Sequence, residues 1–579
     1  MNHIKDESRA SQGDVHKTLR ITPGIVIVII QWLLWMFIPR IFPGAWISAV
    51  GVMGGLLGGI AVLIWWVFFS RAPRFDRWNA LILWILSLFV AYTFTDESIT
   101  TGMQGMMFPA FALPVLSLVF VIWAVASRHL SLTKRRISML ICILLASGVW
   151  ILLRSEGMTG DARIDLAWRW SETSEEKLLS QSGKEQVSMK ATSLSMGTEA
   201  EWPGFRGVQR DSKIQDLKIE TDWTTSPPLE LWRRPVGPGC SSFAVHGEMM
   251  YTLEQRGDNE VVACYNLHSG DPVWKYSYEA RFWDSHAGAG PRSTPTLSNG
   301  RVYTLGATGI LNVIDETDGT LIWSRDAASE TGMQSLEWGF ASSPLVVNEL
   351  VIVAVSGKLA AYDIEAGEPS WYGPDGGESW SSPHLLSIDG VEQVVFMSES
   401  GATSFQPEDG KVLWEHPWPG AQIVQPAFCE DGDLIISAGN AKGIGRFKVS
   451  LASDVWTVEE RWISVRLRPN FNDFVVHKGH AYGFEGPSLA CLDLEDGKRK
   501  WKSGRYGGQI LLLADQDLLL VLTEKGELTL VEALPSKHTE LSKFPAIESK
   551  TWNHPVLVND ILLVRNTQEM AAFRLKLLK

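Results

Sequence analysis

The sequence predicts an all-β, eight-bladed propeller that follows an α-helical membrane domain of five transmembrane helices. Two observations predict the propeller: a hairpin-like phrase recurs after about residue 230, and its closing aromatic residues lie 39 to 49 residues apart. A period in the forties with strand-like patterning is typical of four-stranded propeller blades rather than of helical solenoids. A third observation predicts the membrane domain, since five long apolar runs precede the repeats.

The recurring phrase is clearest from Ile310 to Ser324. An alternating apolar run ends in Asp315, a turn contains Gly319, and a short strand ends on Trp323, four residues after the glycine. This pattern predicts a β-hairpin. We expect the repeat tryptophans to pack as wedges between adjacent blades. The phrase returns with the same glycine-to-tryptophan spacing at Ala263 to Trp274, Ala360 to Trp371, Thr403 to Trp414 and Ala490 to Trp501.

The number of strands predicts how the ring closes. Eight hairpins precede the third strands of the repeats, and the last of the eight third strands is Ala571 to Leu575. That strand has no tryptophan strand after it, whereas Leu229 to Pro235, which contains Trp232, has no blade before it. We therefore expect the N-terminal strand to complete the last blade, which leaves no long unpaired sheet edge.

These repeats resemble the pyrroloquinoline-quinone-type propeller repeat, whose core is Asp-x-x-x-Gly-x-x-x-Trp. A Ser-x-Pro or Ser-Pro begins the next blade at Ser293-Thr294-Pro295, Ser343-Pro344 and Ser382-Pro383. The stretch from Trp202 to Gly207 is similar to the Trp-Pro-x-Phe-Arg-Gly signature that precedes many bacterial members. The resemblance implies a propeller over residues 201–579. It does not imply one activity, because the superfamily contains both quinoprotein dehydrogenases and the cofactor-free lipoprotein scaffold of outer-membrane β-barrel assembly.

Residues 1–20 are polar and are expected to form a cytoplasmic tail, and residues 21–153 are expected to form the transmembrane domain. Most of the apolar runs are long enough to cross about 30 Å of hydrocarbon as helices. A cleavable signal peptide would not be followed by four more spans. The runs are Ile21 to Ile38, Trp46 to Phe69, Trp78 to Phe94, Met107 to Ala126 and Ile137 to Leu153.

Basic residues in the loops predict the orientation of the chain. Two loops are basic, whereas the other two carry Arg40 alone or Asp96 with Glu97. The positive-inside rule then places the N-terminus in the cytoplasm and everything after Arg154 outside. We expect a protein of the bacterial inner (cell) membrane with a periplasmic or otherwise extracytoplasmic propeller. The basic residues are Arg71, Arg74 and Arg77 in one loop and Arg128, Lys134, Arg135 and Arg136 in the other.

Three features lie outside the propeller. Gly51, Gly55 and Gly59 recur every four residues in the second run, which favours close helix packing, either within the bundle or between two copies. No acidic residue or histidine lies deep in a run, so the helices are expected to anchor the protein, with a contact surface for membrane quinone as the alternative. Residues 154–200 are mostly polar and are predicted to form a flexible linker.

Aromatic and polar residues gather in the loops that lead into the innermost strands. In a propeller these loops converge on one mouth of the central channel. Indole, imidazole, guanidinium and amide groups at one mouth can stack on and hydrogen-bond a flat, anionic ligand. Alternatively, the tryptophans cap the channel and the polar groups satisfy loop backbones. The candidates for cofactor binding are Trp283, His286, Arg292, Trp338, Trp380, Asn472, Asp473, Trp552, Asn553 and His554.

The resemblance leaves two functions open, and it does not decide whether the protein is an enzyme. The favoured one is a binding or scaffold module that holds an envelope protein or another envelope component. The other is a membrane-bound quinoprotein dehydrogenase that uses pyrroloquinoline quinone with a calcium ion and passes electrons to membrane quinone. In that enzyme the stacking residue would be Trp338, Trp380 or Trp552, the partner of the cofactor carboxylates Arg292, and the base Asp284 or Asp473.

Further features of the resemblance bear on the enzyme. A dehydrogenase of the methanol or ethanol type implies a vicinal Cys-Cys pair, which this sequence lacks. It also implies calcium bound by oxygen ligands, and Glu337, Asn472 and Asp473 supply the residue types. The layout is similar to that of membrane-bound glucose dehydrogenase. That enzyme has a considerably longer propeller, whereas the blades here have little excess length.

Composition and motifs argue against several other classes of function. The net charge is −13 at pH 7 although the loops of the membrane domain are basic, so the propeller is acidic and nucleic acid is not expected as a partner. No nucleophile elbow, phosphate-binding loop or zinc-protease motif is present. The five cysteines predict no disulfide framework, and no metal site is expected, since His477-x-x-His480 spans a turn without further ligands.

Overall fold

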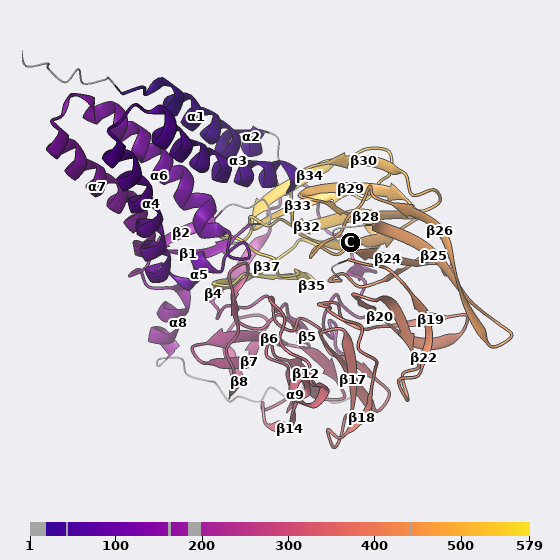
Figure 1. The fold of residues 1–579 in the computed structure, drawn as a ribbon. Helices are drawn as coiled ribbons and strands as arrows, with labels where there is room; N and C mark the ends of the chain where they lie inside the picture. The colour runs from indigo at the N-terminus through magenta and orange to yellow at the C-terminus, as the bar shows by residue number, and fades with distance from the viewer. Residues whose placement is uncertain are drawn as a thin grey trace, which may run out of the picture. The chain divides into compact units, whose positions relative to one another are not determined.

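The structure is a computed structural model that describes residues 19–41, 45–159, 164–182, 199–420, 422–438 and 442–578. The chain forms two compact units, residues 1–171 and 172–579. Figure 1 shows the helices of the first unit and the strands of the second. Most of the predicted cytoplasmic tail, residues 1–20, and residues 183–198 of the predicted linker lie outside the described residues.

The first unit is a bundle of helices. In the described part of the chain, five helical stretches are long and apolar enough to cross a membrane, and they coincide with the five predicted runs: Thr22–Ile41, Val50–Phe69, Arg74–Phe94, Met107–His129 and Leu132–Leu152. The α-helices are α1 (Thr22–Trp32), α2 (Ile38–Ile41), α3 (Ala45–Ile64), α4 (Arg74–Phe94), α5 (Glu97–Thr100), α6 (Met107–Ala126) and α7 (Leu132–Gly148). Short π-helical segments (Leu33–Phe37, Trp65–Phe69) and 3₁₀ turns (Ser127–His129, Val149–Leu152) extend them.

Glycines of α3 let neighbouring side chains approach its backbone. A Cβ atom at Gly58 would lie 2.4 Å from the side chain of Gln31, and one at Gly55 would lie 2.9 Å from Trp35 and 3.2 Å from Pro114. Gln31 also donates a hydrogen bond from Nε2 to the carbonyl oxygen of Gly55, at 2.7 Å. Of the two predicted uses of these glycines, the structure therefore shows packing within the bundle.

Ion pairs join two basic loops at one end of the bundle. Asp76, in the first turn of α4, lies 2.8 Å from Nη2 of Arg135 and 2.6 Å from Nε of Arg136, near the start of α7. The Asp76 side chain is buried, with an exposed fraction of 3%. Because one carboxylate contacts both arginines, the loops before α4 and α7 lie at the same end of the bundle, as the predicted orientation requires.

Part of the predicted linker carries secondary structure. In the first unit, β1 (Leu153–Met158) pairs antiparallel with β2 (Ile164–Trp168). In the second unit, α8 (Ser174–Ser182) follows a capping box, in which the backbone N–H of Glu176 donates to Oγ1 of Thr173 and the N–H of Thr173 donates to Oε2 of Glu176.

Helix α8 is fixed to the first blade of the propeller. Glu175 accepts a hydrogen bond from the backbone N–H of Gly257, at 2.8 Å, and its carboxylate lies 2.9 Å from Nη1 of Arg281. Leu178 is buried, with an exposed fraction of 2%. The middle of the predicted linker is therefore part of the propeller unit rather than a free tether.

The second unit is an eight-bladed propeller, as predicted. Each blade has four antiparallel strands, and its first strand lies innermost, since consecutive first strands such as β5, β11 and β15 contact one another. In chain order the first four blades are β5 to β8 (Ala244–His246, Met249–Arg256, Asn259–Asn266, Pro272–Glu279), β11 to β14 (Thr296–Ser298, Arg301–Leu305, Ile310–Asp315, Leu321–Asp326), β15 to β18 (Leu345–Val347, Leu350–Val355, Lys358–Asp363, Pro369–Tyr372) and β19 to β22 (His384–Ile388, Val391–Ser398, Gly401–Phe405, Val412–His416).

The remaining strands complete the ring. The last four blades are β23 to β26 (Ala427–Phe428, Leu434–Ala438, Gly443–Ala452, Val455–Ser464), β27 to β30 (Val475–His477, His480–Glu485, Ser488–Asp493, Arg499–Ser503), β31 to β34 (Gln509–Leu513, Leu518–Leu522, Glu527–Glu532, Glu540–Pro545), and β35 to β37 (Val556–Val558, Ile561–Arg565, Glu569–Arg574) with β4 (Leu229–Pro235). Short elements between them are β3 (Lys213–Ile214), β9 (Trp283–Asp284), β10 (Gly288–Ala289), α9 (Ala327–Thr331) and a 3₁₀ turn at Ala514–Gln516.

The repeat tryptophans are wedges between blades, which confirms the prediction. Trp274 of β8 donates a hydrogen bond from Nε1 to the carbonyl oxygen of Glu316 in the next blade, at 3.1 Å. Its ring covers Gly319, where a Cβ atom would lie 2.6 Å from the indole and where φ is +76°. Both constraints favour glycine. The same type of bond joins Trp232 to Leu267, Trp323 to Ile364, Trp371 to Pro407, Trp462 to Leu494 and Trp501 to Leu534.

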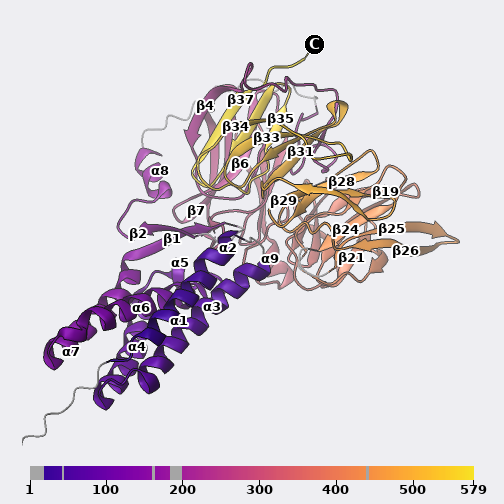
Figure 2. The ribbon, with the colours of Figure 1, turned by 90° about the horizontal axis from the view of Figure 1, so that it is seen from above.

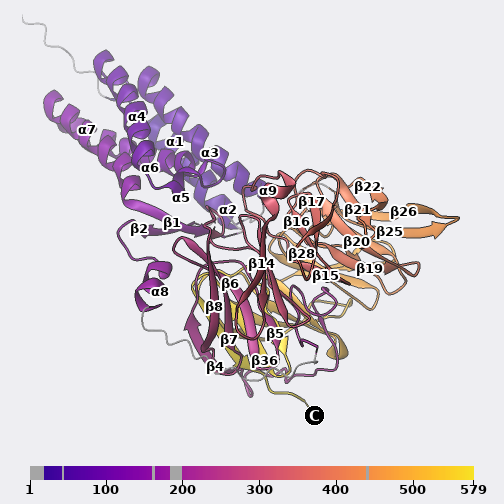
Figure 3. The ribbon, with the colours of Figure 1, turned by 90° about the horizontal axis from the view of Figure 1, so that it is seen from below.

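The fifth blade departs from this pattern. Its outer strands β25 and β26 have ten residues each and extend beyond the blade (Figures 2 and 3). The blade lacks the glycine of the repeat phrase, so Trp414 of the preceding blade donates instead to Oε1 of Gln393 in its own blade, at 2.6 Å. The expectation of little excess length is therefore wrong for this blade.

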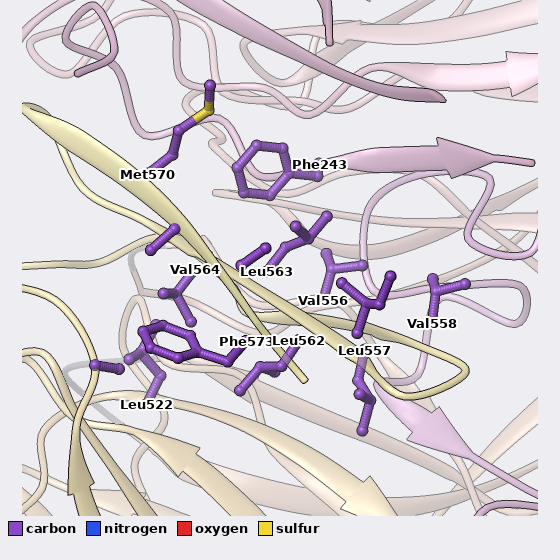
Figure 4. Close-up of a cluster of buried hydrophobic side chains, with 14 of the residues drawn as sticks. Phe243, Leu522, Val556, Leu557, Val558, Leu562, Leu563, Val564, Met570 and Phe573 are labelled. Atoms are coloured by element: carbon purple, nitrogen blue, oxygen red, sulfur yellow. The ribbon is translucent and has the colours of Figure 1, made fainter. Parts of the chain in front are cut away.

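The N-terminal strand completes the last blade, as predicted. Strand β4 pairs antiparallel with β37, and Trp232 lies opposite Ala572. Across the joint with the first blade, the buried Arg565 donates hydrogen bonds to the carbonyl oxygens of Leu253, at 2.9 Å, and Gly237, at 3.0 Å. Apolar side chains of the last blade pack in one cluster with Phe243 of the first (Figure 4). Backbone pairing, buried polar contacts and apolar packing thus all close the ring.

Candidate functional site

The predicted site lies on the loops that connect the last strand of one blade to the innermost strand of the next. Strands alternate in direction within each blade, so these loops form one mouth of the channel, and the repeat-phrase turns form the opposite face. The structure divides the ten predicted residues into two groups. One group surrounds the mouth, and the other lies in the channel beside a segment that precedes the first blade.

Three aromatic residues from neighbouring loops meet at the mouth. The ring of Trp338 lies 4.5 Å from that of Trp380 and 6.1 Å from that of His286, measured between centroids. Each of the three residues comes from a different loop, so their contact depends on the closed ring of blades. The indole N–H groups of Trp338 and Trp380 have no hydrogen-bond partner in the described part of the chain. Both nitrogen atoms are buried, so each N–H is an unpaired donor inside the loops of the mouth.

A lysine that the sequence did not single out lies beside Trp552. The Nζ atom of Lys550 is 3.9 Å from the centroid of the Trp552 ring and donates a hydrogen bond to the carbonyl oxygen of His286, at 2.7 Å. Trp552 in turn donates from Nε1 to Oε1 of Glu524, at 2.7 Å, and packs 4.9 Å from Phe471. Burial lowers the pKa of Lys550. The contact with His286 links this side of the mouth to the tryptophan pair.

Trp283 and Arg292 lie in one loop and make contacts within it. Trp283 pairs with Ala289 in the short hairpin of β9 and β10. Nη2 of Arg292 lies 2.5 Å from Oδ2 of Asp284 and also donates to the carbonyl oxygen of Gly288, at 2.6 Å. Arg292 could bind cofactor carboxylates only if it lost these contacts. Asp284 could act as a base only if it lost its ion pair with Arg292.

The two asparagines satisfy loop backbones. Asn472 donates from Nδ2 to the carbonyl oxygen of Gly508, at 2.6 Å, and Asn553 donates to those of Ser241, at 2.7 Å, and Gly239, at 3.2 Å. Each of these bonds joins consecutive loops of the ring. For Asn472 and Asn553 the structure therefore corresponds to the alternative in which polar groups support the backbone.

Below the mouth, hydroxyl groups join successive blades around the channel. The backbone N–H of Ser242 donates to Oγ1 of Thr294, at 3.1 Å, the N–H of Thr294 donates to Oγ of Ser343, at 3.0 Å, and the N–H of Ser343 donates to Oγ of Ser382, at 2.9 Å. The three acceptors each precede a proline of the Ser-Pro or Ser-x-Pro motifs, so at these junctions the motif supplies the acceptor that holds one innermost strand to the next.

The segment Trp202 to Ile214 crosses the channel, and we call it the plug. It bonds to the innermost strands of the first two blades, since Trp202 exchanges backbone hydrogen bonds with Val245 and the carbonyl oxygen of Pro203 accepts one from Leu297, at 2.7 Å. At its far end, Lys213 and Ile214 form β3, which pairs in parallel with β31 of the seventh blade.

Arginines and a histidine hold the middle of the plug. Arg210 donates hydrogen bonds to the carbonyl oxygens of Ser343 and Pro344, both at 3.0 Å, and His384 lies 3.1 Å from the carbonyl oxygen of Gln209. Burial and nearby arginines lower the pKa of His384 to about 4 and that of Arg210 to about 9. These contacts reach the third and fourth blades, so the plug spans the channel rather than following one wall.

The predicted residues Asp473 and His554 also contact the plug. Oδ1 of Asp473 lies 3.4 Å from Nη1 of Arg206, and its Oδ2 lies 3.4 Å from Nε2 of His554. The His554 ring packs edge-on, 5.0 Å from Phe205, and burial lowers its pKa to about 4, so the imidazole is neutral at pH 7. Arg206 also donates to the carbonyl oxygen of Phe474, at 2.8 Å.

The residues expected to hold a quinone and a calcium ion do not form one site. Asp473 lies in the ion pair with Arg206, Asn472 bonds to a loop carbonyl, and Arg292 is held in its own loop. The channel beneath the mouth is crossed by the plug. These side chains would have to exchange their contacts before they could surround a cofactor, so the arrangement does not fit the predicted cofactor site.

Comparisons with known proteins match the propeller repeats of this chain to one family. The family described as outer membrane protein assembly factor BamB matches residues 226–371 and 258–503. A protein of that name from Shewanella oneidensis is 22% identical over 322 residues, which is 51% of this chain and 75% of the relative. Its counterpart from Yersinia pestis is 22% identical over 369 residues, covering 61% of this chain and 78% of the relative.

Solved structures match the chain at low identity. The structure of BamB from Moraxella catarrhalis covers 60% of this chain and 99% of its own, with 12% identity and a TM-score of 0.45. A quinohemoprotein alcohol dehydrogenase from Comamonas testosteroni covers 69% of this chain and 84% of its own, with 12% identity and a TM-score of 0.47.

Proposed function

The propeller of this chain is built from pyrroloquinoline-quinone-like repeats, and on this premise we propose that it is an extracytoplasmic binding or scaffold module for envelope proteins. A five-helix anchor in the bacterial cell membrane would hold it, with the N-terminus in the cytoplasm. The sequence relatives carry the name of an outer membrane protein assembly factor, which supports a role in holding other envelope proteins. The paired ends of α4 and α7 support the orientation, because they bring the basic loops to one side.

The plug is the observation that carries this proposal. It occupies the channel with the protein's own chain, and it engages Asp473, one of the two residues expected to act as a base. What the propeller still offers a partner is the mouth, with the tryptophan pair, and the edges of its blades. Both are surfaces suited to another macromolecule rather than enclosed pockets for a small substrate.

Photocrosslinking in living bacteria tests the proposed binding module. A photoreactive amino acid at Glu337, exposed beside Trp338 at the mouth, should give discrete adducts with envelope proteins. The matched control is Asp409, exposed in a repeat-phrase turn on the opposite face, which should give none. Equal labelling from both positions, or adducts from neither, would contradict a role centred on the mouth.

A quinoprotein dehydrogenase is the second candidate, because the aromatic pair of Trp338 and Trp380 at the mouth could stack on a flat cofactor. The geometry of the channel leads us to expect no saturable binding when the full-length protein in detergent is titrated with pyrroloquinoline quinone and calcium in a calorimeter. Calcium-dependent binding at micromolar concentrations that is lost in Trp380→Ala would reverse this assignment and favour electron transfer to membrane quinone.

A further inference from the structure

We propose that the β1–β2 hairpin is a second membrane contact, which lies in the lipid headgroup layer through Leu166, Trp168 and Trp170. This inference rests on the proposed membrane anchor. The chain enters the hairpin directly from the fifth apolar stretch, which ends at Leu152, while β1 begins at Leu153. No linker separates the two, so the hairpin begins where the hydrocarbon layer would end.

Contacts within the first unit fix the hairpin over the ends of the helices. The backbone N–H of Ser155 donates to Oγ of Ser98, at 2.8 Å, and Nη1 of Arg169 donates to the carbonyl oxygen of Phe94, at 3.1 Å. Phe94 is the last residue of α4 and Ser98 lies in α5. The hairpin is therefore attached at the end of the third apolar stretch as well as at the end of the fifth, and it cannot move far from the surface that both define.

One face of the hairpin is apolar and only partly covered. The pairing places Leu153 opposite Trp168 and Ser155 opposite Leu166, so Ile164, Leu166 and Trp168 share a face. Leu153 and Ile164 pack against an apolar cluster of the helix ends. Leu166 and Trp168 lie on the same face but are left partly uncovered, with exposed fractions of 43% and 49%.

Trp170 extends this surface. Its ring stacks on that of Trp168, with centroids 5.0 Å apart and an interplanar angle of 13°, and 68% of it is exposed. Two stacked indoles in water beside an apolar helical surface are costly, whereas the bilayer interface accommodates tryptophan because the ring is apolar and its N–H can reach water or lipid oxygens. The fifth apolar stretch leads directly into the hairpin and exposes apolar side chains such as Leu145, which is 68% exposed, so we assign the lipid interface as the occupant.

Site-directed spin labelling of the full-length protein in phosphatidylethanolamine and phosphatidylglycerol nanodiscs tests this assignment. Labels would be placed by Leu166→Cys on the apolar face, by Asp165→Cys on the opposite face and by Leu145→Cys on α7, in a background with Cys142→Ala and Cys240→Ala. The other three cysteines are buried. The label at position 166 should collide several-fold less with a water-soluble nickel complex than the label at 165 does, and more with oxygen.

The possible outcomes distinguish a failure of the hairpin assignment from a failure of the proposed membrane anchor. If the labels at 165 and 166 are equally accessible to nickel while the label at 145 is protected, the inference about the hairpin is overturned and the anchor stands. If the label at 145 is accessible too, the anchor itself is overturned. Protection of position 166 from both nickel and oxygen would indicate a protein contact and would also overturn the inference.

A second set of variants tests the two tryptophans themselves. In the 166-labelled protein, Trp168→Ala with Trp170→Ala should raise the nickel collision rate several-fold toward that of position 165. Both side chains are largely exposed, so the double variant is expected to fold. An unchanged collision rate would show that the tryptophans do not hold the hairpin at the lipid surface.

Discussion

Replacing Arg206 by methionine should lower the free energy of unfolding of the propeller by about 3–5 kcal/mol. Arg206 is buried in the plug, where it faces Asp473 and donates to the carbonyl oxygen of Phe474. The variant leaves the Asp473 carboxylate buried without its cation and leaves a carbonyl oxygen without a donor. Denaturant unfolding of the full-length protein in detergent, followed by tryptophan fluorescence, measures the change.

Lys213→Met is the matched control for this variant. Lys213 lies in the same segment, but its partner Asp211 is 3.5 Å away and both side chains are partly exposed. A pair of that kind contributes only about 0–1 kcal/mol. If Arg206→Met costs no more than Lys213→Met, the plug does not stabilise the ring.

Replacing Trp274 by alanine should cost about 3–5 kcal/mol, because the change opens a cavity between the first two blades. The side chain is almost fully buried, covers Gly319 and bonds to the carbonyl oxygen of Glu316. The same unfolding measurement reports the loss. Trp274→Phe retains a ring without the N–H, so it separates packing from the hydrogen bond, which contributes about 1 kcal/mol.

Leu321→Ala is the control for Trp274→Ala. Leu321 begins the outer strand of the next blade, and its exposed fraction is 38%. Its truncation should change stability by roughly 0.5 kcal/mol or less. Similar losses for Trp274→Ala and Leu321→Ala would contradict the role of the repeat tryptophans as wedges.

The ring and its closure could be predicted because their signals repeat. In three of the five phrases the tryptophan lies over the glycine of the next blade, as Trp274 lies over Gly319, so a local spacing reports a contact between blades. The unmatched strands at the two ends likewise report the pairing of β4 with β37. The fifth blade was counted in the predicted ring, but the length of its outer hairpin was not predicted, because that hairpin replaces the phrase.

The plug could not be predicted because its contacts have no local pattern. Arg206 reaches Phe474, 268 residues away, and both Arg206 and Arg210 adopt positive φ angles in an irregular backbone. The signature around Trp202 marked the segment without indicating where it lies. Helix α8 did have a readable signal, since Thr173 and Glu176 have the spacing of a capping box, but the polar composition around them favoured a linker.

The sequence predicted which residues lie near one another at the candidate site, but it did not predict which of their side chains already have partners. The sequence placed His286, Trp338 and Trp380 on loops at the same mouth, and in the structure their rings contact one another. It could not show that Arg292 and Asp473 are already paired, because their partners are fixed by tertiary geometry rather than by spacing along the chain.

The plug and β4 also set an order for folding. Both are synthesised before any blade, yet β37, the partner of β4, is the last strand of the chain. Until that strand is made, β4 is an unpaired edge, and contacts between segments far apart in the sequence form slowly. A chain interrupted before Glu569 would keep seven blades but leave this edge open to pairing with other chains, so the final residues decide whether newly made protein is a closed ring or a substrate for aggregation.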